Sequence, residues 1–269
     1  MRSILLHIHD DECLDARMQV ALDLARAFDA HLTCVQAMPF ELGVPGDLYG
    51  TMAAELLPDI RLQAEALRER LTSKLAVEDV VWEWIHEDGL AREQLLRRAG
   101  LSDIIVLGSR EPFRTKGPSP LVGDVVLHSR TPVLVVPPDV RQFGCDGAAI
   151  IAWDGSPEAS RALRGAVPLL AKASSVTLIT VTGESGKTID LPPVEGAEYL
   201  SRHGIASELT DLPFDGGPVG EKLARAAVAR GASYVVMGAY GHSRVLETIW
   251  GGVTRELFSK PPLPILACH

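Results

Sequence analysis

Glycine residues near the end of the sequence are spaced so that they could hold a phosphate group. Gly238 and Gly241 follow the apolar segment 234–237, and the pair Gly251-Gly252 comes ten residues after Gly241. Glycines at the end of a strand let the backbone turn sharply and approach a ligand without interference from a Cβ atom. Free backbone N–H groups at a following helix start would attract an anion. The order of strand, glycine loop and helix start predicts a phosphate cradle, most simply for a nucleotide.

The residues around this cradle have types that suit the other parts of a nucleotide. Asp154, at the end of the apolar segment 149–153, is able to accept a hydrogen bond from a ribose hydroxyl or to lie near a phosphate-bound Mg²⁺. Val181 and Met237 end two other apolar segments and are placed to pack on an adenine ring. The candidate set is completed by neighbouring residues, namely Ala152, His242, Ser243, Gly251, Gly252, Val253 and Thr254.

Each of these residues also has an ordinary structural role open to it. Asp154 would suit a cap of the following helix, Val181 and Met237 would suit the core, and the glycines would suit turns. The combination favours nucleotide binding, because strand, glycine loop and helix start occur in the order that a phosphate requires.

The composition limits the classes of protein to consider. With 46% hydrophobic and 23% charged residues it predicts a soluble globular protein, and 269 residues suffice for one large domain or two of ordinary size. The net charge of −9 argues against a general affinity for nucleic acid or anionic membranes. No apolar run reaches bilayer-crossing length, and the first residues reach charged groups too early for a signal sequence. Four scattered cysteines favour reduced thiols, so we expect a cytoplasmic protein.

Apolar segments and helical patterns alternate along the chain, which predicts parallel sheets covered by helices on both faces. In the first half we expect strands at 4–9, 31–37, 80–85, 104–108 and 132–136, and helices at 14–28, 52–75 and 89–99. In the second half we expect strands at 149–153, 175–181, 234–238 and 264–268, and helices at 158–171, 194–202 and 220–229.

Landmarks of the two halves recur at a similar offset. Gly108 and Gly238, which end late strands, lie 130 positions apart, and the first-strand ends His9 and Asp154 lie 145 positions apart. This pattern predicts a tandem duplication. We place the two domains at residues 1–140 and 146–269, with a linker at 137–147 that is rich in proline, glycine and polar residues.

The spacing Gly238-x-x-Gly241, nine residues and then Gly251 resembles the ATP-binding motif of the universal stress protein family. Asp154 is similar to the acidic residue at the end of that family's first strand. The resemblance covers nearly the whole chain. It implies two tandem Rossmann-like domains, each a five-stranded parallel sheet with helices on both faces. It further implies a stress-response regulator that binds ATP or AMP, with Mg²⁺ an open question, and whose two last strands pair as an internal pseudo-dimer. A homodimer of such chains stays open.

Gly252 departs from the family motif, which has serine or threonine there. Loss of one charge-assisted hydrogen bond costs about 1.5–3 kcal/mol. Weaker ATP binding, AMP binding or no nucleotide therefore remain alternatives.

The first half departs further from the motif. Glu111 stands at the second glycine position, Gly123-Asp124 at the place of the later glycine pair, and His9 where the second half has Asp154. A carboxylate that faces phosphates would repel them. We therefore predict one nucleotide site, in the second half.

His7 and His9 would lie on one face of a strand, where two histidines can bind a metal. No distant ligands with a convincing spacing accompany them, so two neutral histidines in a sheet are the favoured interpretation.

The sequence does not predict an efficient enzyme. No nucleophile–base pair and no Walker lysine accompany the glycines. Slow ATP hydrolysis, or autophosphorylation on Ser243 or Thr254, stays open, and the main alternative to nucleotide binding is an interaction scaffold of the same fold.

Overall fold

The computed structural model describes residues 1–38, 51–111, 117–182, 191–241 and 252–269, with the side chains of residues 51–54 left aside. The elements of the first half are β1 (Ser3–Ile8), α1 (Leu14–Phe28), β2 (His31–Met38), α2 (Thr51–Leu75), β3 (Val81–Asp88), α3 (Ala91–Ala99), β4 (Ile104–Gly108), α4 (Pro120–Ser129) and β5 (Val133–Val136). Those of the second half are β6 (Ala148–Ala152), α5 (Pro157–Leu170), β7 (Ser175–Thr182), α6 (Pro193–Arg202), β8 (Glu208–Pro213), α7 (Val219–Ala229), β9 (Ala232–Gly238), α8 (Gly252–Ser259) and β10 (Ile265–Cys268).

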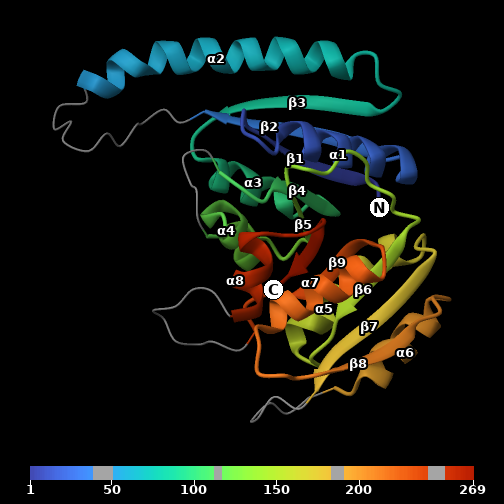
Figure 1. Ribbon diagram of the computed structural model, residues 1–269. Helices are drawn as coiled ribbons and strands as arrows, with labels where there is room; N and C mark the ends of the chain where they lie inside the picture. The colour runs from blue at the N-terminus through green and yellow to red at the C-terminus, as the bar shows by residue number, and fades with distance from the viewer. Residues whose placement is uncertain (39–50, 112–116, 183–190, 242–251) are drawn as a thin grey trace.

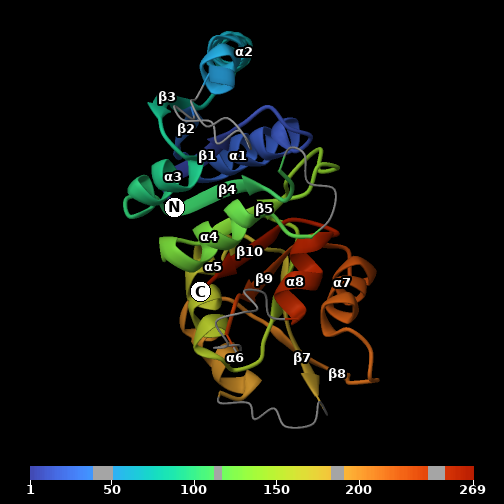
Figure 2. The same cartoon turned by 90° about the vertical axis from the view of Figure 1, so that its left-hand side faces the viewer.

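The strands form one ten-stranded sheet in the order β3-β2-β1-β4-β5-β10-β9-β6-β7-β8 (Figure 1). All pairs within a half are parallel, and helices lie on both faces (Figure 2). Counted from its own first strand, each half has the order 3-2-1-4-5. The predicted fold class, two tandem Rossmann-like units of five parallel strands, is therefore confirmed.

The two halves meet where β5 and β10 pair antiparallel. Leu134 stands opposite Leu266 in this register, and both side chains are fully buried. Short apolar strands such as these would be exposed edges if each half stood alone, and exposed edges promote aggregation. Pairing them with each other removes that edge from both halves.

Edge and central strands differ in how much of their sequence is buried. The central strands β4, β5 and β10 are buried at every residue, whereas the edge strands β3 and β8 alternate between exposed and half-buried residues. The sequence pattern predicts no strand at Glu208–Pro213, because an exposed edge strand lacks the apolar run by which central strands are recognised.

The linker predicted at residues 137–147 is packed against both halves. Phe143 and Cys145 are buried, and the Phe143 ring lies 5.6 Å from that of Tyr234. The backbone N–H of Phe143 donates to Asp23 of α1 at 2.9 Å. These contacts fix the linker between α1 and the start of β9. None of the helices in the described parts of the chain is long and apolar enough to cross a bilayer.

Candidate functional site in the second half

Gly238, the last residue of β9, lies directly against the first turn of α5. An ideal Cβ atom built on it would stand 2.4 Å from the backbone nitrogen of Ala159 and 2.6 Å from the carbonyl carbon of Glu158. Both neighbours are backbone atoms of a helix, so no side chain could be accommodated without moving that helix. The sequence requires glycine here because strand and helix approach each other closely.

Gly241 faces the side chain of Glu158. A Cβ atom on Gly241 would lie 2.7 Å from Oε2 of Glu158. Oε1 of the same carboxylate accepts a hydrogen bond from Nη1 of Arg161 at 3.1 Å, and the Glu158 side chain is only 13% exposed. The space beside the second glycine of the motif therefore holds a carboxylate of this chain.

Asp154 lies in the turn between β6 and α5 and is exposed. Its Oδ1 accepts hydrogen bonds from the backbone N–H and the hydroxyl of Ser156, at 3.1 and 2.6 Å. Ser156 itself caps α5 by accepting from the N–H of Ala159. The capping role that the sequence left open for Asp154 is thus carried by Ser156, and Asp154 supports that cap with one of its two carboxylate oxygens.

Helix α8 begins at Gly252, as the second glycine pair predicted. Gly252 is exposed, and a Cβ atom on it would meet no described atom within 4 Å. Val253 is half-buried. Thr254 is buried, and its Oγ1 accepts a hydrogen bond from the N–H of Tyr240 at 3.5 Å. Thr254 therefore ties the glycine loop to the helix start instead of facing solvent.

Tyr240 adopts a left-handed backbone conformation between the two glycines, with φ of 66°. Its ring meets that of His269 edge-on at 6.3 Å, and Nδ1 of His269 lies 3.0 Å from the carbonyl oxygen of Ala239. Burial raises the pKa of the Tyr240 hydroxyl, and the carboxylate of Asp124 in α4 raises it further. The negative charge of Asp124 in the first half thus acts on Tyr240 in the loop after β9.

The predicted adenine-facing residues occupy different environments. Met237 is buried in the core, paired in register with Ala152 on β6 and Ala267 on β10. Val181, near the end of β7, and Ala152 are half-buried. The remaining predicted site residues, His242, Ser243 and Gly251, lie outside the described residues.

In the first half, the start of the corresponding helix is occupied by Glu111. Its Oε1 accepts hydrogen bonds from the backbone N–H of Leu121 at 2.7 Å and from the hydroxyl of Ser119, the residue that caps α4. The carboxylate therefore does more than repel a phosphate: it takes the helix-start donors that a phosphate would use. Gly123-Asp124, predicted to match the glycine pair that precedes a helix in the second half, does not begin a helix: α4 begins at Pro120, and Asp124 lies inside it, 3.4 Å from Nε of Arg92.

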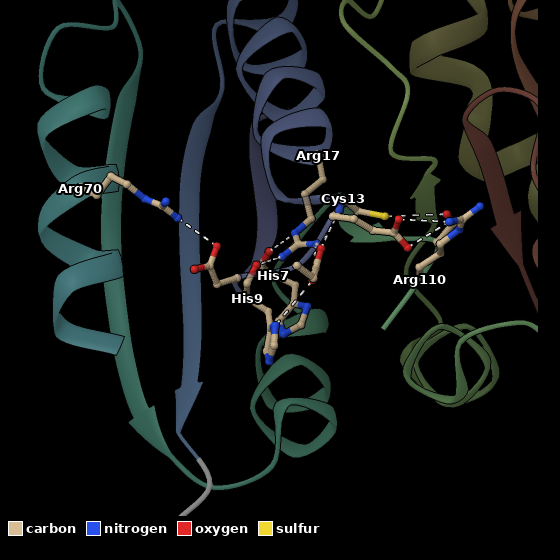
Figure 3. Close-up of polar contacts among 10 residues, drawn as sticks. His7, His9, Cys13, Arg17, Arg70 and Arg110 are labelled. Atoms are coloured by element: carbon tan, nitrogen blue, oxygen red, sulfur yellow. Dashed lines mark hydrogen bonds and ion pairs between the residues drawn. The ribbon is translucent and has the colours of Figure 1, made fainter. Parts of the chain in front are cut away.

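Arg17 of α1 lies against the ends of β1 and β4 in the first half (Figure 3). Its side chain is fully buried, Nη1 lies 2.6 and 2.8 Å from the two carboxylate oxygens of Asp11, and Nε donates to the carbonyl oxygen of His7 at 2.8 Å. Nη2 donates to the carbonyl oxygen of His9. A Cβ atom on Gly108 would stand 2.8 Å from Nη1 of Arg17. An internal guanidinium thus occupies the strand ends where the second half leaves Asp154 exposed.

His7 and His9 have rings 6.1 Å apart but unlike surroundings. His7 is buried, and burial lowers its pKa well below the usual value, helped by the positive charge of Arg17 and by His9. The His9 side chain is 46% exposed and lies 3.6 Å from Asp11. Within the described ranges no group of three or more His, Cys, Asp or Glu side chains is arranged to hold a metal ion.

The sequence did not single out Glu158 and Arg17, the two charged residues that lie beside the strand-end glycines of the two halves. A signal for both was present, since residues 13 and 158 share the 145-position offset of His9 and Asp154, and Arg17 correspondingly aligns with Ala162. A residue-by-residue comparison of the first helical turns pairs the thiol of Cys13 with the carboxylate of Glu158. It also pairs the guanidinium of Arg17 with the methyl group of Ala162.

Comparisons with known proteins agree with this architecture. Residues 149–269 match the model of the universal stress protein family. The whole chain is similar to the crystal structure of a universal stress protein from Archaeoglobus fulgidus DSM 4304, with 18% identity, a TM-score of 0.74, and 99% of this chain and 96% of that chain covered. A putative universal stress protein from Pseudomonas aeruginosa UCBPP-PA14 matches with 14% identity, a TM-score of 0.63, and coverages of 100% and 93%. A comparison with curated proteins found no match.

The family match rests on the second half, and the structural likeness extends over both. Residues 149–269 are therefore assigned to the universal stress protein family, and the first half repeats the same fold in tandem.

Proposed function

We propose that this protein is a cytoplasmic stress-response regulator that binds one adenine nucleotide, ATP or AMP, in its second half. One contrast between the halves carries the proposal. At the start of α8, Gly252 is exposed and a Cβ atom on it would meet no described atom within 4 Å, whereas the start of α4 is filled by the carboxylate of Glu111. A helix N-terminus with free N–H groups attracts an anion, and one already paired with a carboxylate does not.

The residues around the open helix start suit the other parts of the nucleotide. Asp154 is exposed, and one of its carboxylate oxygens, Oδ2, has no part in the Ser156 contacts, so it suits a ribose hydroxyl or Mg²⁺. Half-buried Val181 offers an apolar surface to the adenine ring. Met237 is already in the core, so it would support the base from beneath only through its small exposed surface. Residues 1–140 and 146–269 act as the two domains in this proposal.

The pairing of β5 with β10 supports a second part of the proposal, an internal pseudo-dimer. The antiparallel register joins the last strands of both halves. One chain would then supply the contact that otherwise requires two single-domain subunits. Sedimentation of the full chain would show whether two such chains associate further.

A nucleotide-independent interaction scaffold is the second candidate, and two observations favour it. The Glu158 carboxylate lies beside Gly241, and the residue at Gly252 carries no hydroxyl. Under this alternative, substitutions in the glycine loop leave partner capture unchanged.

Isothermal titration of the full chain with ATP and with AMP tests the proposal. We expect one site per chain in the wild type and loss of binding in Gly241→Glu, because a second carboxylate would join Glu158. Gly100→Glu is the matched control, since a Cβ atom at Gly100 meets no described atom within 4 Å and the residue lies in the first half. If the wild type shows no heat with either ligand and releases no nucleotide on denaturation, the scaffold is the correct alternative.

A further inference from the structure

The Glu158 carboxylate is a fixed negative charge at the edge of the proposed nucleotide site. Three features hold it in place. Glu158 lies in the first turn of α5, where the helix dipole favours an acidic group. Arg161, one turn later, donates to Oε1 at 3.1 Å. Gly241 has no side chain that would displace Oε2. A carboxylate with a 13% exposed side chain held in this way keeps its position better than one on a free surface.

The equivalent position in the first half carries no such charge. Cys13 stands there, and its Cβ atom lies 2.7 Å from the place that a Cβ atom on Gly108 would take. The residue before α1 thus lies against Gly108 as the first turn of α5 lies against Gly238. Burial raises the pKa of the Cys13 thiol, so it stays neutral. The charge beside the glycine loop therefore belongs to the half whose helix start is open.

Among the described residues of the β6–α5 turn and the first turns of α5, the charges are unbalanced towards the negative side. Asp154 and Glu158 are both acidic, and one basic residue, Arg161, pairs with Glu158 and has a side chain that is 49% exposed. The repulsion energy of two like charges is proportional to the product of the charges. Water screens this repulsion less when one of the charges is largely buried.

We propose that Glu158 selects the ligand by its phosphate charge, so that the second half favours an adenine nucleotide with few phosphate charges, AMP over free ATP. This inference rests on the proposed function, because it concerns the same site. A nucleoside monophosphate presents about half the negative charge of a triphosphate. The cost of placing it near Glu158 is correspondingly smaller, and a divalent cation bound to ATP offsets part of the difference.

Titration of wild type and Glu158→Gln with adenosine, AMP and ATP, with and without Mg²⁺, tests the proposal. The amide keeps the shape of the side chain and removes its charge. We expect no change for uncharged adenosine, about threefold tighter binding of AMP and about tenfold tighter binding of ATP without Mg²⁺. Mg²⁺ should narrow the gain for ATP. Glu195→Gln is the matched control, because Glu195 is an exposed acidic residue in the first turn of α6.

The outcomes separate this inference from the proposed function. If Glu158→Gln changes the three affinities by one common factor or not at all, Glu158 does not select by charge, while the nucleotide site stands. If neither protein binds adenosine, AMP or ATP, the proposed function fails and the inference with it. Should Glu158→Gln not fold, the wild type still provides a test: raising the salt concentration should reduce its preference for AMP over ATP, and a preference independent of salt overturns the proposal.

Discussion

Nη1 of Arg17 lies between the two carboxylate oxygens of Asp11, 2.6 and 2.8 Å away, and the two side chains are 0% and 6% exposed. Removing one partner leaves an uncompensated buried charge. We expect Arg17→Met and Asp11→Asn each to lower the free energy of unfolding by about 3–5 kcal/mol. Urea unfolding followed by circular dichroism measures this.

A matched control for this pair lies on the same helix. Arg26 pairs with Glu78 and Asp79 in a solvent-exposed setting. Exposed ion pairs contribute little, so Arg26→Met should change stability far less than Arg17→Met. Equal effects of the two substitutions would contradict the buried role of Arg17.

Buried His7 should make the stability of the protein depend on pH. Its pKa in the folded state is lowered by burial and by Arg17, whereas in the unfolded chain it titrates near the ordinary histidine value of about 6.5. Below that value the unfolded state binds more protons than the folded state. The contribution is therefore fully present above the unfolded pKa and is lost as pH falls towards the lowered folded value. The slope is at most about 1.4 kcal/mol per pH unit.

Unfolding measured between neutral and mildly acidic pH checks this, with His7→Gln expected to flatten the dependence. His203→Gln is the control, because His203 is exposed at the end of α6. A pH dependence that is identical in wild type and His7→Gln would assign it to other groups.

Glu111→Gln should destabilise the first half and leave the number of nucleotides bound per chain unchanged. Replacing its carboxylate by the amide of Glu111→Gln weakens the charge-assisted hydrogen bond to the N–H of Leu121, which lies at the start of α4. We expect a loss of about 1 kcal/mol in the free energy of unfolding and still one nucleotide per chain in titration. Glu12→Gln, which removes an exposed pair with Arg110, is the comparison. Two nucleotides per chain in Glu111→Gln would show that Glu111 alone prevents nucleotide binding in the first half.

The sequence predicted the repeated strand and helix order well, because buried central strands leave continuous apolar runs. Ile104–Gly108 and Val133–Val136 are such runs, and the structure buries every residue in them. It failed at Glu208–Pro213, an edge strand whose residues are largely exposed. The physical reason is that burial on both faces, and not strand geometry itself, produces the pattern that a reader recognises.

The site was predictable in its glycines but not in its charges. Gly238 and Gly241 stand out in the sequence, yet the atoms that require them belong to Glu158 and Ala159, some eighty residues earlier in the chain. Glu158 and Arg17 look like ordinary solvent-exposed charges in amphipathic helices. Only the tertiary contact of helix against strand end buries them. No local pattern encodes that contact, and a residue-by-residue comparison of the two halves singles out the two positions without showing that they are buried.

Gly252 is the position at which one substitution should strengthen the proposed site. It begins α8, it is exposed, and a Cβ atom there meets no described atom within 4 Å, so a small side chain fits without displacing a neighbour. Gly252→Ser would add a hydroxyl donor at the helix start, as in the family motif, and one hydrogen bond to a charged group contributes about 1.5–3 kcal/mol. We expect nucleotide binding about tenfold tighter in titration calorimetry. Gly252→Ala separates the hydroxyl from the change in backbone freedom, because it adds the Cβ atom alone. If both variants bind equally, the gain comes from a more rigid helix start; if neither gains, the phosphate does not lie at this helix N-terminus.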